Sequence, residues 1–151
     1  MHPMQPERAA ARDQVGRAVG VIGLISIALI HLLDGVNVLH VHVVIFALYL
    51  ALMAGTFVVA AVLLRTDSRL AWSLALLMAG LTFLGFVLSR TSGLPGFRDE
   101  VGNWLEPLGL SSLFVEGSVV LLAVYKVATT PPVTELVTAI TRSSEREARP
   151  A

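Results

Sequence analysis

The sequence predicts an all-α membrane protein, a four-transmembrane-helix bundle with both termini cytoplasmic and a short amphipathic C-terminal helix. Three observations support this fold class. The 151 residues are 55% hydrophobic and 15% charged, with a mean hydropathy of +0.75, which is too apolar for a typical water-soluble domain. The charged residues form short clusters that separate four long apolar runs. The basic residues divide unequally between the two sides that these runs define.

The apolar runs predict spans at approximately residues 16–34, 41–64, 70–89 and 108–127. The first uncharged run, 18–33, would be about 24 Å long as a helix, so we expect the helix to extend to residues 16 and 34 to cross the bilayer core. The second run, 35–64, is too long for one span, and we expect residues 35–40 to form an outer turn. Glu116 is the one charged residue that interrupts the fourth run, 107–125. The transmembrane domain is thus 18–127, between a cytoplasmic N-terminal segment, 1–17, and a cytoplasmic segment, 128–151.

The distribution of Lys and Arg predicts the orientation. One side of the predicted membrane holds nine basic residues, and the other side holds two, Arg90 and Arg98. The nine are Arg8, Arg12, Arg17, Arg65, Arg69, Lys126, Arg142, Arg146 and Arg149. The positive-inside rule therefore places both termini in the cytoplasm. Because ten of the eleven basic residues are Arg, a bacterial plasma membrane is the expected location.

Two amphipathic segments lie outside the spans. Val133, Leu136, Val137 and Ile140 follow the helical spacing i, i+3, i+4 and i+7, which predicts a short helix on the inner leaflet. The residues after Thr141 are polar and are expected to be disordered. In the outer loop, an apolar stripe at Val101, Trp104, Leu105 and Leu108 predicts a short interfacial helix.

Rows of small residues predict how the helices pack. Apolar helices gain no hydrophobic energy from meeting inside lipid, so contact depends on close packing at small side chains. The second span carries Ala47, Ala51 and Gly55, the third carries Ala71, Ala75 and Ala79, and the first carries Gly16 and Gly20. These rows predict that the second and third helices pack through their small-residue faces.

Ionisable residues at membrane depth are the strongest indicators of a functional site, because each costs roughly 2.5–3.5 kcal/mol on insertion scales. Glu116 lies well inside the fourth span and must be protonated or paired. A salt bridge to Arg90 is one hypothesis, and a proton or cation site is the other. His31 and Asp34 share one face at the outer end of the first span.

The same residues admit a metal hypothesis. His31, Asp34, His42 and Glu116 could converge in the outer half of the bundle, and imidazole with carboxylate ligands suits a divalent transition metal. A haem held between His31 and His42 is a further alternative. His40 and His42 as interface residues, with His31 as an interhelical hydrogen-bonding group, is the simpler interpretation.

Several function classes are disfavoured. With a formal net charge of zero, the chain has no overall field for nucleic acid. The absence of Cys excludes disulfides, thiolate metal sites and cysteine catalysis. No phosphate-binding glycine loop, Ser-centred nucleophile elbow or HExxH motif occurs, so no catalytic residue and no cofactor is assigned.

Two segments of the outer loop, SRTSGLPG at 89–96 and GNWLEPLGL at 102–110, are followed by Glu116. With Ile30-His31-Leu32-Leu33-Asp34, they resemble an uncharacterised family of small four-span membrane proteins from high-GC bacteria. The similarity covers most of 18–127. The resemblance implies a family signature that comprises His31, Asp34, Arg90, Gly93, Pro95, Gly96, Trp104, Glu106, Pro107 and Glu116. The stretch that contains His40 and His42 departs from that pattern.

Taken together, these observations predict a non-enzymatic accessory or scaffold protein whose outer polar cluster of Arg90, Glu116, His31 and Asp34 is mainly structural. Its expected partners are the lipid bilayer and either another membrane protein or a second copy of itself. The alternatives are metal or haem binding, and proton-coupled transport of a small solute through Glu116.

Overall fold

The computed structural model describes residues 4–38, 43–94, 98 and 100–131. Within these residues the regular elements are four α-helices, α1 (Met4–Val38), α2 (Val43–Arg65), α3 (Arg69–Thr91) and α4 (Pro107–Thr129). All four are long and apolar enough to cross a membrane. The predicted all-helical class with four helices of spanning length is therefore confirmed, and the helices fit a multi-pass integral membrane protein. The expected C-terminal helix, His40 and His42 lie outside the described residues.

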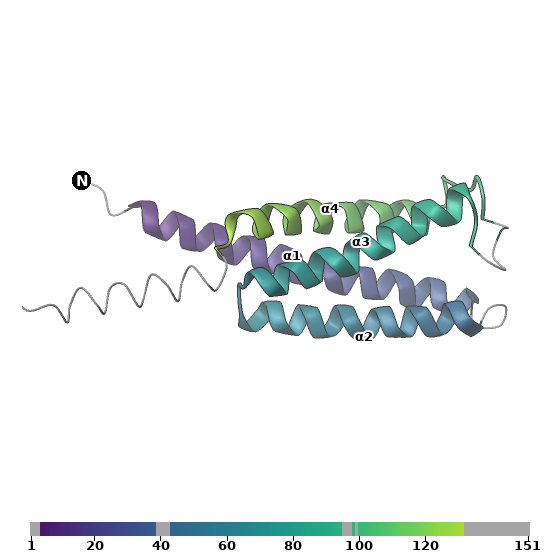
Figure 1. Ribbon diagram of the computed structural model, residues 1–151, viewed down its shortest axis with the longest axis horizontal. Helices are drawn as coiled ribbons and strands as arrows, with labels where there is room; N and C mark the ends of the chain where they lie inside the picture. The colour runs from purple at the N-terminus through teal and green to yellow at the C-terminus, as the bar shows by residue number, and fades with distance from the viewer. Residues whose placement is uncertain (1–3, 39–42, 95–97, 99, 132–151) are drawn as a thin grey trace, which may run out of the picture.

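The helices run antiparallel to their neighbours in the chain and form two hairpins, α1–α2 and α3–α4 (Figure 1). We call the end where α1 starts and α4 finishes the terminal end, and the opposite end the hairpin end. Contacts are most extensive within each hairpin, and α1 also packs along α4. By contrast, α2 and α3 meet near the terminal end and diverge toward the hairpin end.

Helix α1 begins at Met4, about three turns before the predicted span. Its first turns extend past the ends of the other helices (Figure 1). The alanines and arginines of 8–12 have high helix propensity, and the side chains described there are exposed. Helix formation in this segment is thus a local property of the sequence, and it continues the helix beyond its apolar part.

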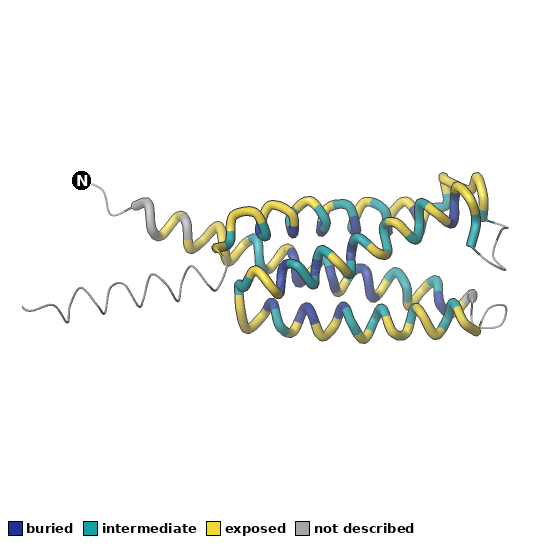
Figure 2. The backbone as a smooth tube through the Cα atoms, viewed as in Figure 1, coloured by how far each residue is buried: buried dark blue, intermediate teal, exposed yellow. Residues whose placement is uncertain are grey.

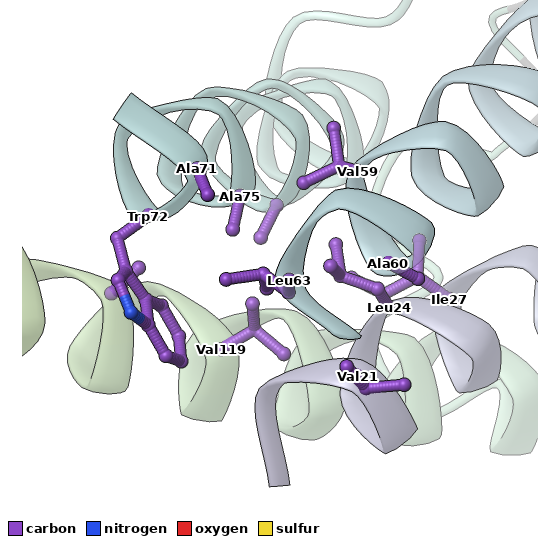
Figure 3. Close-up of a cluster of buried hydrophobic side chains, with 12 residues drawn as sticks. Val21, Leu24, Ile27, Val59, Ala60, Leu63, Ala71, Trp72, Ala75 and Val119 are labelled. Atoms are coloured by element: carbon purple, nitrogen blue, oxygen red, sulfur yellow. The ribbon is translucent and has the colours of Figure 1, made fainter. Parts of the chain in front are cut away.

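The buried side chains lie on the inward faces of the helices along the middle of the bundle (Figure 2). Figure 3 shows one apolar cluster that includes Leu24 and Ile27 of α1, Leu63 of α2, Trp72 of α3 and Val119 of α4. These five side chains are at most 2% exposed. The interior between the two ends is therefore apolar and closely packed.

Two glycines of α1 allow its close approach to α3 and α4. A Cβ atom on Gly20 would lie 2.7 Å from the ring of Trp72, and one on Gly23 would lie 2.3 Å from a methyl carbon of Val119. Both separations are far below van der Waals contact. The missing side chains at these two positions let α1 reach the core.

The packing prediction from small residues is correct for α3 and incomplete for α2. Ala71, Ala75 and Ala79 are fully buried. In α2, Gly55 packs beside the sulfur of Met78, but Ala47 and Ala51 are exposed. The physical reason is the divergence of α2 from α3, because α3 no longer covers the hairpin-end half of the α2 row (Figure 1).

The connection between α3 and α4 forms turns at 100–105 in place of the expected interfacial helix. Two glycines in this connection have positive φ, Gly93 at 75° and Gly102 at 83°, a conformation that glycine adopts readily. The backbone amide of Gly102 donates to the carbonyl of Arg90. This hydrogen bond draws the connection back over the end of α3, so the apolar stripe does not form a helix.

We expect Gly20→Ala to destabilise the bundle by about 1–3 kcal/mol, because its methyl group would overlap the Trp72 ring. Gly80→Ala is the matched control, since nothing lies within 4 Å of its Cβ position, and its stability should change by no more than about 1 kcal/mol. Equilibrium unfolding in detergent measures both changes. Equal effects of the two substitutions would contradict the packing described for α1.

Candidate functional site

Glu116 is the most deeply buried ionisable residue at the hairpin end. Its side chain is fully buried on α4, about 13 Å along the helix from Pro107. The hydroxyl of Ser112, one turn earlier, donates a 2.6 Å hydrogen bond to Oε1. The other oxygen, Oε2, is buried without a hydrogen-bond partner among the described residues. Such an atom is costly in an apolar interior, so the carboxyl group needs a further partner or a proton.

His31 of α1 faces this carboxyl group. Its Nδ1 lies 2.9 Å from the carbonyl oxygen of Ile27. Because a carbonyl oxygen can only accept, Nδ1 carries the proton, and in the neutral ring Nε2 is left with a lone pair. Nε2 lies 3.9 Å from Oε1 of Glu116, which is longer than a hydrogen bond. The two groups that face each other are both able to bind protons.

Asp34 and Tyr49 extend the cluster to α2. The Tyr49 hydroxyl donates a 2.8 Å hydrogen bond to Oδ2 of Asp34. The rings of Tyr49 and His31 pack edge to face, with their centroids 5.0 Å apart. Glu116, Ser112, His31, Asp34 and Tyr49 thus form one hairpin-end polar cluster from three helices.

The four proposed metal ligands are not assembled among the described residues. Glu116 and His31 face each other, whereas the Asp34 carboxylate accepts from Tyr49. In the part of the chain that the structure describes, no group of three His, Cys, Asp or Glu side chains is placed to hold a metal ion. His42, the fourth expected ligand and the second expected haem ligand, lies outside that part.

Arg90 pairs with carboxylates other than Glu116. Its Nη1 lies 2.7 Å from Glu100 and its Nη2 lies 3.9 Å from Glu106. The guanidinium also lies over the Phe86 ring, 4.9 Å from the centroid. In this arrangement Arg90 does not form the salt bridge to Glu116 that was one hypothesis from the sequence. The reason is depth, because Glu106 caps the start of α4 beside Arg90, whereas Glu116 lies nearly three turns further into the helix.

Several signature residues of the resemblance gather around Arg90. The Trp104 ring meets Phe86 edge to face, with centroids 6.2 Å apart. The Glu106 side chain accepts from the amides of Leu108 and Gly109, and Pro107 occupies the first turn, which is a favourable N-terminal cap. Gly93 provides the positive φ just after α3. These residues close the hairpin end of α3 and α4. Pro95 and Gly96 lie outside the described residues.

A second ionic cluster at the terminal end was not anticipated from the sequence. Lys126 of α4 is 4% exposed, and its Nζ lies 2.8 Å from Asp13 of α1 and 3.1 Å from Asp67 of the α2–α3 loop. The indole nitrogen of Trp72 donates to Asp67, and a Cβ on Gly16 would lie 3.0 Å from the Lys126 side chain. Asp13 and Asp67, which lie among the arginines that flank the predicted spans, were the available signal.

Comparisons with protein-family models, curated proteins and solved structures find no match to this chain. The features of the chain that bear on its function are therefore the two clusters and the exposed surface of the bundle.

A double-mutant cycle tests the Arg90 partner. We expect Arg90→Gln and Glu100→Gln to couple by about 1 kcal/mol in unfolding free energy, because each removes the same ion pair. Arg90→Gln and Glu116→Gln should be additive within about 0.5 kcal/mol. Chemical unfolding in detergent provides both values, with exposed Arg98→Gln as the control. Strong coupling between Arg90 and Glu116 would overturn the assignment.

Proposed function

We propose that this chain is a non-enzymatic accessory or scaffold protein of the plasma membrane that binds a partner helix along α2. One observation carries the proposal. Ala47 and Ala51 are exposed on the hairpin-end half of α2, although they continue the row that packs at Gly55. Because residues four apart share one helix face, the face that meets α3 near the terminal end is not covered by any of the described residues beyond the point of divergence.

The chemistry of lipid favours a second helix on this face. Transmembrane helices associate through close van der Waals packing, and small residues at intervals of four permit that approach. A partner helix from another membrane protein or from a second copy of this chain fits the Ala47–Ala51 face. The two buried cations support a structural role for the ionic groups, because both Arg90 and Lys126 are neutralised by carboxylates of this chain.

The proposed orientation places the terminal end in the cytoplasm. Among the described residues, this end carries Arg8, Arg12, Arg17, Arg65, Arg69 and Lys126, and the hairpin end carries Arg90 and Arg98. That asymmetry follows the positive-inside rule. We also propose membership of the resembled family of small four-span bacterial membrane proteins, on the basis of its signature residues around Arg90.

Single cysteines test the orientation cleanly, because the chain has no native Cys. Thr66→Cys lies in the exposed loop at the terminal end, and Leu105→Cys lies at the hairpin end, where Leu105 is 83% exposed. In right-side-out spheroplasts, a membrane-impermeant maleimide should label Leu105→Cys alone. After permeabilisation, it should label both. The reverse pattern in intact spheroplasts would show that the orientation is wrong.

Photo-crosslinking tests the partner face. We expect a photoreactive phenylalanine analogue at Ala51 to give a protein adduct of defined mass in native membranes. The same analogue at Leu121 of α4, which is 74% exposed and lies outside the proposed partner face, should give no such adduct. Coexpression of two differently tagged copies identifies an adduct between copies of this chain, and mass spectrometry identifies any other partner.

Ala51→Trp provides the matched disruption. Its bulk should weaken helix contact on this face, and the adduct formed from a probe at Ala47 should fall at least fivefold. If probes at Ala47, Ala51 and Leu121 all fail to form protein adducts, α2 has no partner helix and the proposal is wrong.

A further inference from the structure

We propose that Glu116 and His31 form a buried proton-binding site that holds one proton between them and exchanges it through the His31 ring. This proton site is separate from the proposed scaffold role, because Glu116 and His31 lie on α4 and α1, whereas the proposed partner face lies on α2. It rests on three observations: the fully buried carboxyl group, the unpartnered Oε2 atom and the fixed direction of the His31 ring.

The number of bound protons follows from charge. With no proton beyond the one on Nδ1 of His31, Glu116 would be a fully buried carboxylate whose Oε1 accepts from Ser112 and whose Oε2 has no hydrogen-bond partner among the described residues. With two protons, the positive charge of the imidazolium ring would face an uncharged acid. One proton makes the pair neutral overall, and we place it on Glu116 with a neutral imidazole facing it, because a carboxylate and an imidazolium 3.9 Å apart would be two charges without a hydrogen bond between them. Neutrality is the state that an apolar interior favours.

The other groups around the carboxyl do not supply this neutralisation. From α3, the Thr82 hydroxyl lies within hydrogen-bonding reach of Glu116 as well as of main-chain carbonyls of its own helix, but it carries no charge. The Arg90 guanidinium is held by Glu100 and Glu106. Tyr49 of α2 donates to Asp34 of α1. On α4, Ser112 is uncharged. Among the described residues, His31 is thus the basic group that faces Glu116.

Proton exchange requires a small movement. The 3.9 Å between Nε2 and Oε1 must close by about 1 Å to form a hydrogen bond. The O–H bond of Glu116 then breaks, its electron pair stays on the carboxylate, and the proton forms an N–H bond at Nε2. The His31 side chain is 12% exposed and that of Glu116 is 0% exposed. Exchange with solvent therefore passes through the His31 ring.

The route ends at this pair. Between Glu116 and Lys126, α4 contributes buried Val119 and Ala123, and α1 contributes Leu24 and Ile27 on the way to the terminal end. These apolar side chains contain no group that can relay a proton. Thr56 of α2 adds a buried hydroxyl to this interior, and it donates to main-chain carbonyls of its own helix. The described residues therefore form a binding site that opens toward the hairpin end, with no continuous relay among them to the terminal end.

Infrared spectroscopy of the full chain in lipid nanodiscs tests the proton on Glu116. We expect a carbonyl band of a protonated carboxylic acid at neutral pH, and its loss in Glu116→Gln. Glu7→Gln, an exposed carboxyl on the first turn of α1, is the control and should retain the band. Absence of the band from the unchanged protein, or an unaltered band in Glu116→Gln, would overturn the proposal.

Deuterium exchange tests the role of His31. After transfer to D₂O, the band of the unchanged protein should shift rapidly as deuterium replaces the proton. In His31→Phe, the band should remain but exchange at least tenfold more slowly, because the relay group is missing. Equal exchange rates would show that His31 is not the route. If Glu116→Gln does not fold, ¹³C labelling of glutamate carboxyls in the unchanged protein assigns the band, and a band that does not shift with this label would overturn the proposal.

Discussion

The contact of α1 with α3 and α4 at Gly20 and Gly23 is the constraint on which the remainder of the structure depends. In lipid, apolar helices gain little from meeting unless their surfaces fit closely, and Trp72 and Val119 occupy the space where side chains on these glycines would be. This contact also sets the position of the ionic groups. His31 lies two turns after Gly23, and Asp13 lies about two turns before Gly20. Because α1 runs beside α4, both reach partners on that helix.

The ionic groups separate into two clusters with an apolar interior between them. Lys126 with its two carboxylates links α1, α4 and the α2–α3 loop at one end. At the other end, Arg90 links α3 to the turn that precedes α4. Removal of one partner from such a pair leaves an uncompensated charge. The clusters therefore fix which helix ends lie together, while the core between them provides the close packing.

The number of helices and their approximate positions were predictable, because uncharged runs of about 20 residues leave few alternatives. The partners of the ionic residues were less predictable. Sequence distance indicates neither the depth nor the rotation of a helix, so an Arg90–Glu116 pair was one hypothesis where the structure has Arg90–Glu100. The same limit concealed the Lys126 cluster, because Asp13 and Lys126 are 113 residues apart. Ala47 and Ala51 shared the spacing of Gly55, and only the divergence of α2 and α3 distinguishes them.

The chain contains two tryptophans, and their surroundings are opposite in character. Trp72 is fully buried beside Asp67 and Lys126, whereas Trp104 is 39% exposed at the other end of the bundle. Indole emission depends on the polarity of the surroundings and on nearby charge. The protein therefore carries one intrinsic fluorophore at each end, and single-tryptophan versions would report separately on the loosening of either end during unfolding.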